Sequence, residues 1–118
     1  MIATALALMA AAPAAGPDPV TFDIQCVIAT ESAMANPAVK PETKLMLMSA
    51  LTFFSGRVDA EISPAELENR LVDQAKSLEG QQIAPLLKSC GEFMQSRGKV
   101  WTDIGERLQK REQNAHSS

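Results

Sequence analysis

The sequence predicts an all-α protein, a small bundle of four to five helices stapled by one disulfide and preceded by a signal peptide. Strand signals are nearly absent, since the 118 residues include no tyrosine and no Asn-Gly or Asp-Gly turn between alternating segments. Apolar residues instead recur at helical spacing over most of the chain. Two cysteines, Cys26 and Cys90, follow an apolar N-terminal run.

The N-terminal run, residues 1–15 (MIATALALMAAAPAA), carries no charged side chain and ends in small residues that suit signal peptidase. It is shorter than the roughly 20 residues that span a bilayer. We therefore expect residues 1–15 to be a cleaved signal peptide, the protein to be periplasmic or secreted, and no stable membrane anchor to remain.

About 100 residues are left, enough for one core. The expected organisation is a linker at 16–21, a single helical domain at 22–112 and a flexible tail at 113–118. In an oxidising compartment an even pair of cysteines is usually a disulfide, which predicts a Cys26–Cys90 bond. Two buried free thiols are the alternative.

The first helix is expected to start near Thr21, which can cap it, and to end near Asn36 and Pro37. Its inner face would comprise Phe22, Cys26, Ala29 and Ala33.

The second helix is expected to begin around Pro41 and to run through Val58. It is apolar nearly all round, which predicts the central and most buried helix of the bundle. Methionines can also line an apolar binding groove, although a core role is the commoner one. The apolar residues are Leu45, Met46, Leu47, Met48, Leu51, Phe53 and Phe54.

The third helix has the clearest start signal, because Ser63 can cap it, Pro64 follows, and Glu66 completes a capping box. Gly80 supplies the stop. The apolar stripe of this helix consists of Leu67, Leu71, Ala75 and Leu78.

The last segment has an alternating spacing of three and four residues, which keeps one apolar seam facing a partner. Gly91, Gly98 and Gly105 recur beside this seam every seven residues, which suggests close approach of a neighbouring helix. A break at Gly98 between two shorter helices is the alternative. The seam residues are Leu87, Cys90, Met94, Arg97, Trp101, Ile104 and Leu108.

Composition argues against several function classes. The formal charge is −3, with 14 acidic and 11 basic residues interspersed, so no basic face for nucleic acid is expected. The single histidine, His116, lies near the C-terminus, which leaves no His-based nucleophile pair or zinc site. No Cys-x-x-Cys motif is present. We therefore expect no enzyme, no metal and no cofactor.

Two arginines could each serve a binding surface, pair with a carboxylate, or extend a charged head to water over an apolar stem. Arg97 is the one charged residue of the seam, and Arg57 has Asp59 and Glu61 near it in sequence. The expected binding surface comprises Met46, Met48, Phe53, Phe54, Arg57, Met94, Arg97 and Trp101.

This layout of an export signal, helices, two widely spaced cysteines and a Phe-Phe-x-Gly-Arg stretch between them resembles the small uncharacterised exported proteins of proteobacteria. It also resembles, more faintly, the HdeA-type periplasmic acid-stress chaperones. The likeness covers Phe22 to Leu108 in layout, and only Cys26 and Cys90 carry over, as the disulfide. It implies a holdase that exposes apolar surface when protonated.

The function we expect is non-enzymatic binding of a protein partner or of unfolded clients. The alternative is a carrier of a small apolar ligand in a cavity between helices, with Arg57 or Arg97 at its mouth. A homodimer formed through the last helix is a further expectation about its partners.

Overall fold

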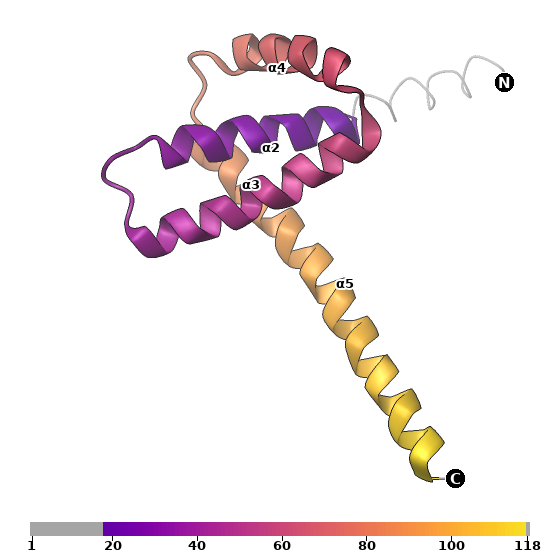
Figure 1. Cartoon of the computed structure of the whole chain (residues 1–118). Coiled ribbons are helices and arrows are strands. Elements are labelled where there is room, and N and C mark those ends of the chain that lie inside the picture. Colours follow the sequence, from indigo (N-terminus) through magenta and orange to yellow (C-terminus); the bar gives the residue numbers. More distant parts are fainter. Residues whose placement is uncertain (1–17, 118) are drawn as a thin grey trace, which may run out of the picture. The chain divides into compact units, whose positions relative to one another are not determined.

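The computed structural model describes residues 18–117, and all regular secondary structure in that range is helical. Its helices are α2 (Pro19–Met34), α3 (Pro41–Glu61), α4 (Pro64–Leu78) and α5 (Ala84–Ser117) (Figure 1). The predicted all-α class is confirmed, and the four helices fall within the predicted range. The Cys26–Cys90 disulfide is also confirmed. The predicted signal peptide lies outside the described residues.

The chain divides into two compact units, the first ending at Gln81 and the second beginning at Gln82. The first contains α2, α3 and α4, and the second is built on α5. The disulfide joins the two covalently, because Cys26 belongs to α2 and Cys90 to α5.

Helix α2 begins at Pro19, two residues earlier than the sequence predicts, because Asp18 rather than Thr21 is its cap. The Thr21 backbone N–H donates to Asp18 Oδ1 at 3.0 Å, and the Thr21 hydroxyl donates to Oδ2 at 2.8 Å. These hydrogen bonds, the backbone one foremost, lower the pKa of the Asp18 carboxyl by favouring its charged form. Pro19 needs no backbone partner at the first helical position.

The start and stop signals of the next two helices are confirmed. Pro41 opens α3, as predicted. At the start of α4, the Glu66 backbone N–H donates to Ser63 Oγ at 3.3 Å. Gly80, just beyond the end of α4, has a φ of 73°, a left-handed conformation that glycine adopts without steric cost.

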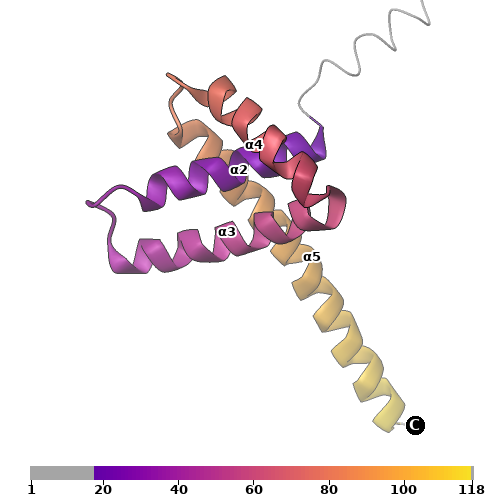
Figure 2. The same cartoon turned by 45° about the horizontal axis from the view of Figure 1, so that its top comes forward.

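Helix α2, not α3, is the most buried helix of the first unit, so the prediction of a central α3 is wrong. Figures 1 and 2 show α2 between α3 and α4, and it packs against both. Because α2 has neighbours on two sides, it buries residues on two faces, whereas α3 buries only Phe54 and Val58. The buried residues of α2 are Asp23, Ile24, Cys26, Ala29 and Thr30.

Aromatic side chains pack against one another where α2 contacts α3. The ring of Phe54 is fully buried and meets Phe22 of α2 edge to face, with centroids 6.2 Å apart. Phe53 approaches Phe54 in the same way at 4.9 Å. Such edge-to-face pairs add to the free energy of apolar burial. They fix which side of α3 faces inward.

Helix α5 is one continuous helix through Gly98, so the alternative of two shorter helices is excluded. It also includes residues 113–117, in the segment that the sequence assigned to a tail. Among residues 18–117, no helix combines the length and the apolar composition needed to cross a bilayer.

We predict that the disulfide contributes a large share of the stability. In the chain-entropy model, closing a loop between positions 26 and 90 stabilises the folded state by about 4 kcal/mol. The double variant Cys26→Ala, Cys90→Ala should lose about this much free energy of unfolding in urea titrations. A loss below about 1 kcal/mol would contradict the prediction.

A second prediction concerns acid. Because the pKa of Asp18 is lower in the folded state than its ordinary value of 3.8, its charge stabilises the fold above that value. This stabilisation is lost as the pH falls through the lowered pKa. Asp18→Asn should therefore reduce the free energy of unfolding at pH 6, and the difference from the native protein should be smaller at pH 2.5, below the ordinary value of 3.8.

Urea titrations at the two pH values measure this difference. Glu68→Gln, on the exposed surface of α4, is the control for removing one negative charge. A deficit of the Asp18→Asn protein that is equal at both pH values would refute the electrostatic explanation.

Candidate functional site

An exposed apolar groove runs along the outer side of α3, and we treat it as the candidate site. It is lined by five residues spaced three or four apart, so that they share one face of the helix. We call this surface the α3 groove; it consists of Leu45, Met48, Ser49, Thr52 and Phe53.

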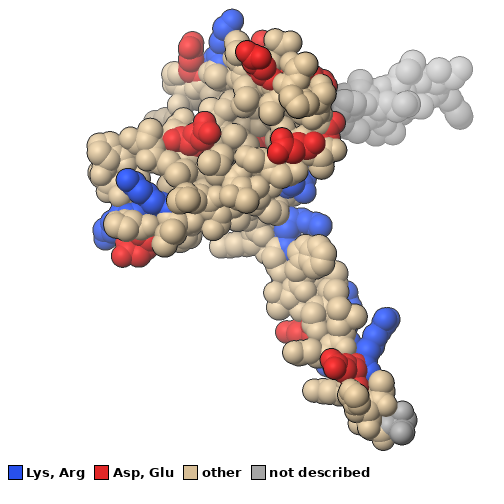
Figure 3. All heavy atoms as spheres, in the orientation of Figure 1, with Lys and Arg blue, Asp and Glu red and all other residues tan. Residues whose placement is uncertain are grey.

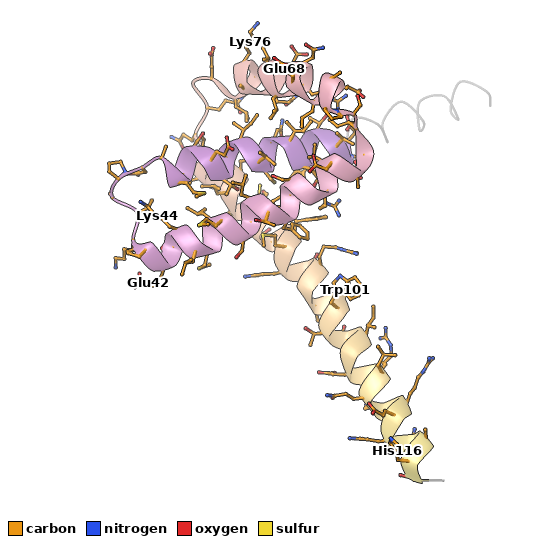
Figure 4. The ribbon with its side chains drawn as sticks, viewed as in Figure 1. Glu42, Lys44, Glu68, Lys76, Trp101 and His116 are labelled. Carbon is orange, nitrogen blue, oxygen red and sulfur yellow. The ribbon has the colours of Figure 1, made fainter. Side chains whose placement is uncertain are left out.

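Large apolar side chains of α3 stand in solvent along and beside this groove. Leu45 is 66 % exposed, Met48 52 %, and the adjacent Met46 72 %. Exposed residues of this kind are common singly, and it is their grouping along one helix that makes this surface a candidate. Figure 4 shows Glu42 and Lys44 near the N-terminal end of α3.

The two hydroxyls of the groove are satisfied by their own helix. Ser49 Oγ donates to the Leu45 carbonyl at 3.1 Å, and Thr52 Oγ1 donates to the Met48 carbonyl at 3.0 Å. Each hydroxyl is therefore turned back onto the backbone, and the surface left for a ligand is mainly methyl and methylene groups. Burying this surface would leave few polar groups without a partner.

The α3 residues predicted for a binding surface have three different placements. Met46 and Met48 are exposed, and Phe53 is half-buried and lines the groove. Phe54 is fully buried in the core and offers no surface to a partner. Arg57 is half-buried one turn further along and holds an ion pair.

The ion pair of Arg57 joins α3 to α2. Its Nε lies 3.0 Å from Asp23 Oδ1 and 3.1 Å from Oδ2, and the guanidinium stands 5.8 Å from the centroid of the Phe53 ring. The Asp23 side chain is fully buried, whereas that of Arg57 is 30 % exposed. This ion pair therefore connects α3 to α2, with the Asp23 carboxylate in the interior and the Arg57 guanidinium at the edge. We call it the Asp23–Arg57 clamp.

The predicted site residues on α5 belong to the second unit. Met94 is half-buried, and Arg97 and Trp101 are exposed. Figure 4 shows Trp101 projecting from the side of α5. On the face in view, Figure 3 shows acidic and basic side chains interspersed, without a large patch of one sign.

One small cavity lies among the three helices of the first unit. It measures about 180 Å³, and neither Arg57 nor Arg97 lines it. Ligand pockets usually measure about 300–1,000 Å³, so only a small apolar molecule would fit. Its lining residues are Ile24, Val27, Ser55, Val58, Asp59, Leu67 and Leu71.

Sequence reasoning missed the role of Asp23 and the outward position of Leu45. Asp23 lies between Phe22 and Ile24 but is not on the one face of this helix that was expected to be buried, so its apolar neighbours were the only signal of its burial. A buried carboxylate requires a cation. The exposure of Leu45 had no such signal. A helix that is apolar on all sides has the same sequence pattern whether all its faces are buried in the core or one face is exposed for a partner.

Among residues 18–117, no group of three or more His, Cys, Asp or Glu side chains is placed to hold a metal ion. Comparison of the chain with protein-family models, with curated proteins and with solved structures finds no match.

The clamp predicts an asymmetry between its two partners. Arg57→Met leaves the buried Asp23 carboxylate without its cation, which should lower the free energy of unfolding by about 3 kcal/mol or more. Asp23→Asn leaves Arg57 able to turn toward water, so its effect should be smaller. Urea denaturation of both variants measures the difference, and equal losses would contradict the clamp.

Proposed function

We propose that this protein is a non-enzymatic, exported binding protein whose α3 groove takes apolar segments of a protein partner or of unfolded clients. The observation that carries the proposal is the exposure of Leu45, Met46 and Met48 beside a groove whose hydroxyls are already satisfied. A solvent-exposed apolar surface of this kind gains free energy when a partner covers it.

The chemistry of the groove suits varied apolar sequences. Methionine has three rotatable side-chain bonds and a polarisable sulfur, so Met46 and Met48 can adapt to different partners. No charged side chain lines the groove to select one partner by its charge. These properties favour broad recognition of apolar segments over recognition of one precise sequence.

The groove is exposed in the folded state, so binding through it needs no prior opening of the helices. This distinguishes the proposal from the holdase that the chaperone resemblance implies, in which acid first exposes apolar surface. Binding is therefore expected at neutral pH as well as in acid.

Export is part of the same proposal. It is supported by the uncharged apolar run at residues 1–15 together with the disulfide, since disulfides persist mainly in oxidising compartments. A binding surface of this kind would then meet clients or partners in the periplasm or outside the cell.

The alternative of a small-ligand carrier is favoured by one observation, the cavity of about 180 Å³ in the first unit. A cavity of this size suits a ligand comparable to benzene rather than a lipid. We place the α3 groove first because its exposed side chains lack a covering layer, whereas a small cavity can simply be an imperfection of packing.

The test is a binding assay with a reduced, carboxymethylated α-lactalbumin as the unfolded client. Native protein should bind it at pH 7 and slow the aggregation of a heated client. A buried Leu or Met side chain contributes about 1.5 kcal/mol or more. The double variant Leu45→Gln, Met48→Gln should therefore weaken binding at least about tenfold.

Val72→Gln is the matched control, because Val72 is a 49 % exposed apolar residue of α4 that does not line the groove. It should bind the client as the native protein does. Unchanged binding by the Leu45→Gln, Met48→Gln protein, or binding that appears only in acid, would refute the proposal.

A further inference from the structure

The C-terminal half of α5 carries large apolar side chains that are exposed among the described residues. Trp101 is 67 % exposed, Leu108 55 % and Val100 42 %. Together with Met94 and Ile104, Trp101 and Leu108 follow the three- and four-residue spacing of a helix-pairing seam. The opposite side of this stretch is polar, where Lys99 and Asp103 pair at 3.2 Å.

Two glycines flank this seam without a close neighbour among residues 18–117. A Cβ built at Gly98 or at Gly105 would meet nothing within 4 Å. Glycine in a helix interior costs about 1 kcal/mol relative to alanine, so both weaken a helix with little of its own core to support it. A second helix packed closely against that flank would explain why these positions carry no side chain.

We infer that α5 pairs antiparallel with α5 of a second copy of this chain, over residues 94–112. This stretch is about 28 Å long at 1.5 Å per residue. The register is centred between Trp101 and Ile104, so that each Trp101 lies across from Ile104 of the other copy. The glycine flanks of the two helices then lie on the same side, where Gly98 approaches Gly105.

The charge of Arg97 on the seam favours the antiparallel orientation over the parallel one. In a parallel pair in register, each Arg97 would face its own counterpart within an apolar layer, and like charges placed opposite one another are destabilising. In the antiparallel register, Arg97 lies across from Leu108 and one turn from Glu112 of the other copy. Arg97 is exposed in the single chain.

Glu112 is available for that pairing. Its side chain is 73 % exposed, and its neighbour along α5 is His116, with Nε2 4.0 Å from the carboxylate. The antiparallel pair therefore contains two equivalent Arg97–Glu112 ion pairs, one near each end of the seam. Its affinity should fall as salt is raised.

The test starts with the protein purified with its disulfide intact, studied by sedimentation equilibrium over about 1–100 μM, the range that weak to moderate association occupies. The expected result is a reversible dimer. Leu108→Glu should raise the dimer dissociation constant at least about tenfold. Gln113→Glu, which adds the same charge on the polar side of α5, is the matched control and should leave it unchanged.

Charge reversal tests the orientation. Arg97→Glu should weaken the dimer, and the double variant Arg97→Glu, Glu112→Arg should restore it. In a parallel pair, Arg97→Glu alone would still place like charges opposite each other, and only its mixture with native protein would associate more tightly than either protein by itself. Stronger association in the mixture would therefore contradict the antiparallel orientation.

The glycines provide a readout that a simple stability effect would not give. Gly98→Ala with Gly105→Ala should raise the helical content of the monomer by circular dichroism, yet weaken the dimer, since two Cβ atoms now separate the helices. A protein that stays monomeric at 100 μM, a dimer indifferent to Leu108→Glu, or one strengthened by the two alanines would overturn the inference.

Discussion

The disulfide between Cys26 and Cys90 is the constraint on which the molecule most depends, because the rest of the core is small. Among the described residues, the large apolar side chains that are nearly or fully buried are Ile24, Phe54 and Val58. A chain of this size gains little surplus free energy from such a core. The covalent bond fixes one point of α5 to the most buried helix and limits how far the two units can separate.

The helices, the Ser63 cap of α4 and the disulfide could be predicted from sequence because each depends on neighbouring residues or on simple pairing. The cap of α2 could not, because Asp18 and Thr21 are both capping residue types and the structure uses Asp18. Ser63 and Gly80 act within one turn of the helix that they delimit. The arrangement of the helices could not be predicted in the same way. An α3 apolar on all sides fits both a central helix and an edge helix with a binding face, and only the position of α2 between α3 and α4 decides between them.

The clamp shows a second limit of sequence reasoning. The carboxylates closest to Arg57 in sequence are Asp59 and Glu61, yet the ion pair forms with Asp23, 34 positions away. Pairing across helices depends on which faces pack together, and this is set by Phe22 and Phe54 rather than by the charges. The continuity of α5 through Gly98 was equally open, because the cost of one glycine is too small to decide whether a long helix breaks.

Dimerisation through α5 would raise the affinity of the protein for clients that bind the α3 groove. The α3 groove belongs to the first unit and the seam belongs to α5, so the two surfaces share no residue and a dimer formed through α5 combines two grooves in one assembly. One assembly then presents two apolar sites. An unfolded client long enough to reach both binds the second site at a high effective concentration, which can raise the overall affinity about a hundredfold or more without any new contact. A weak, adaptable groove becomes useful for holding clients under these conditions, because each contact can release and rebind while the other remains in place.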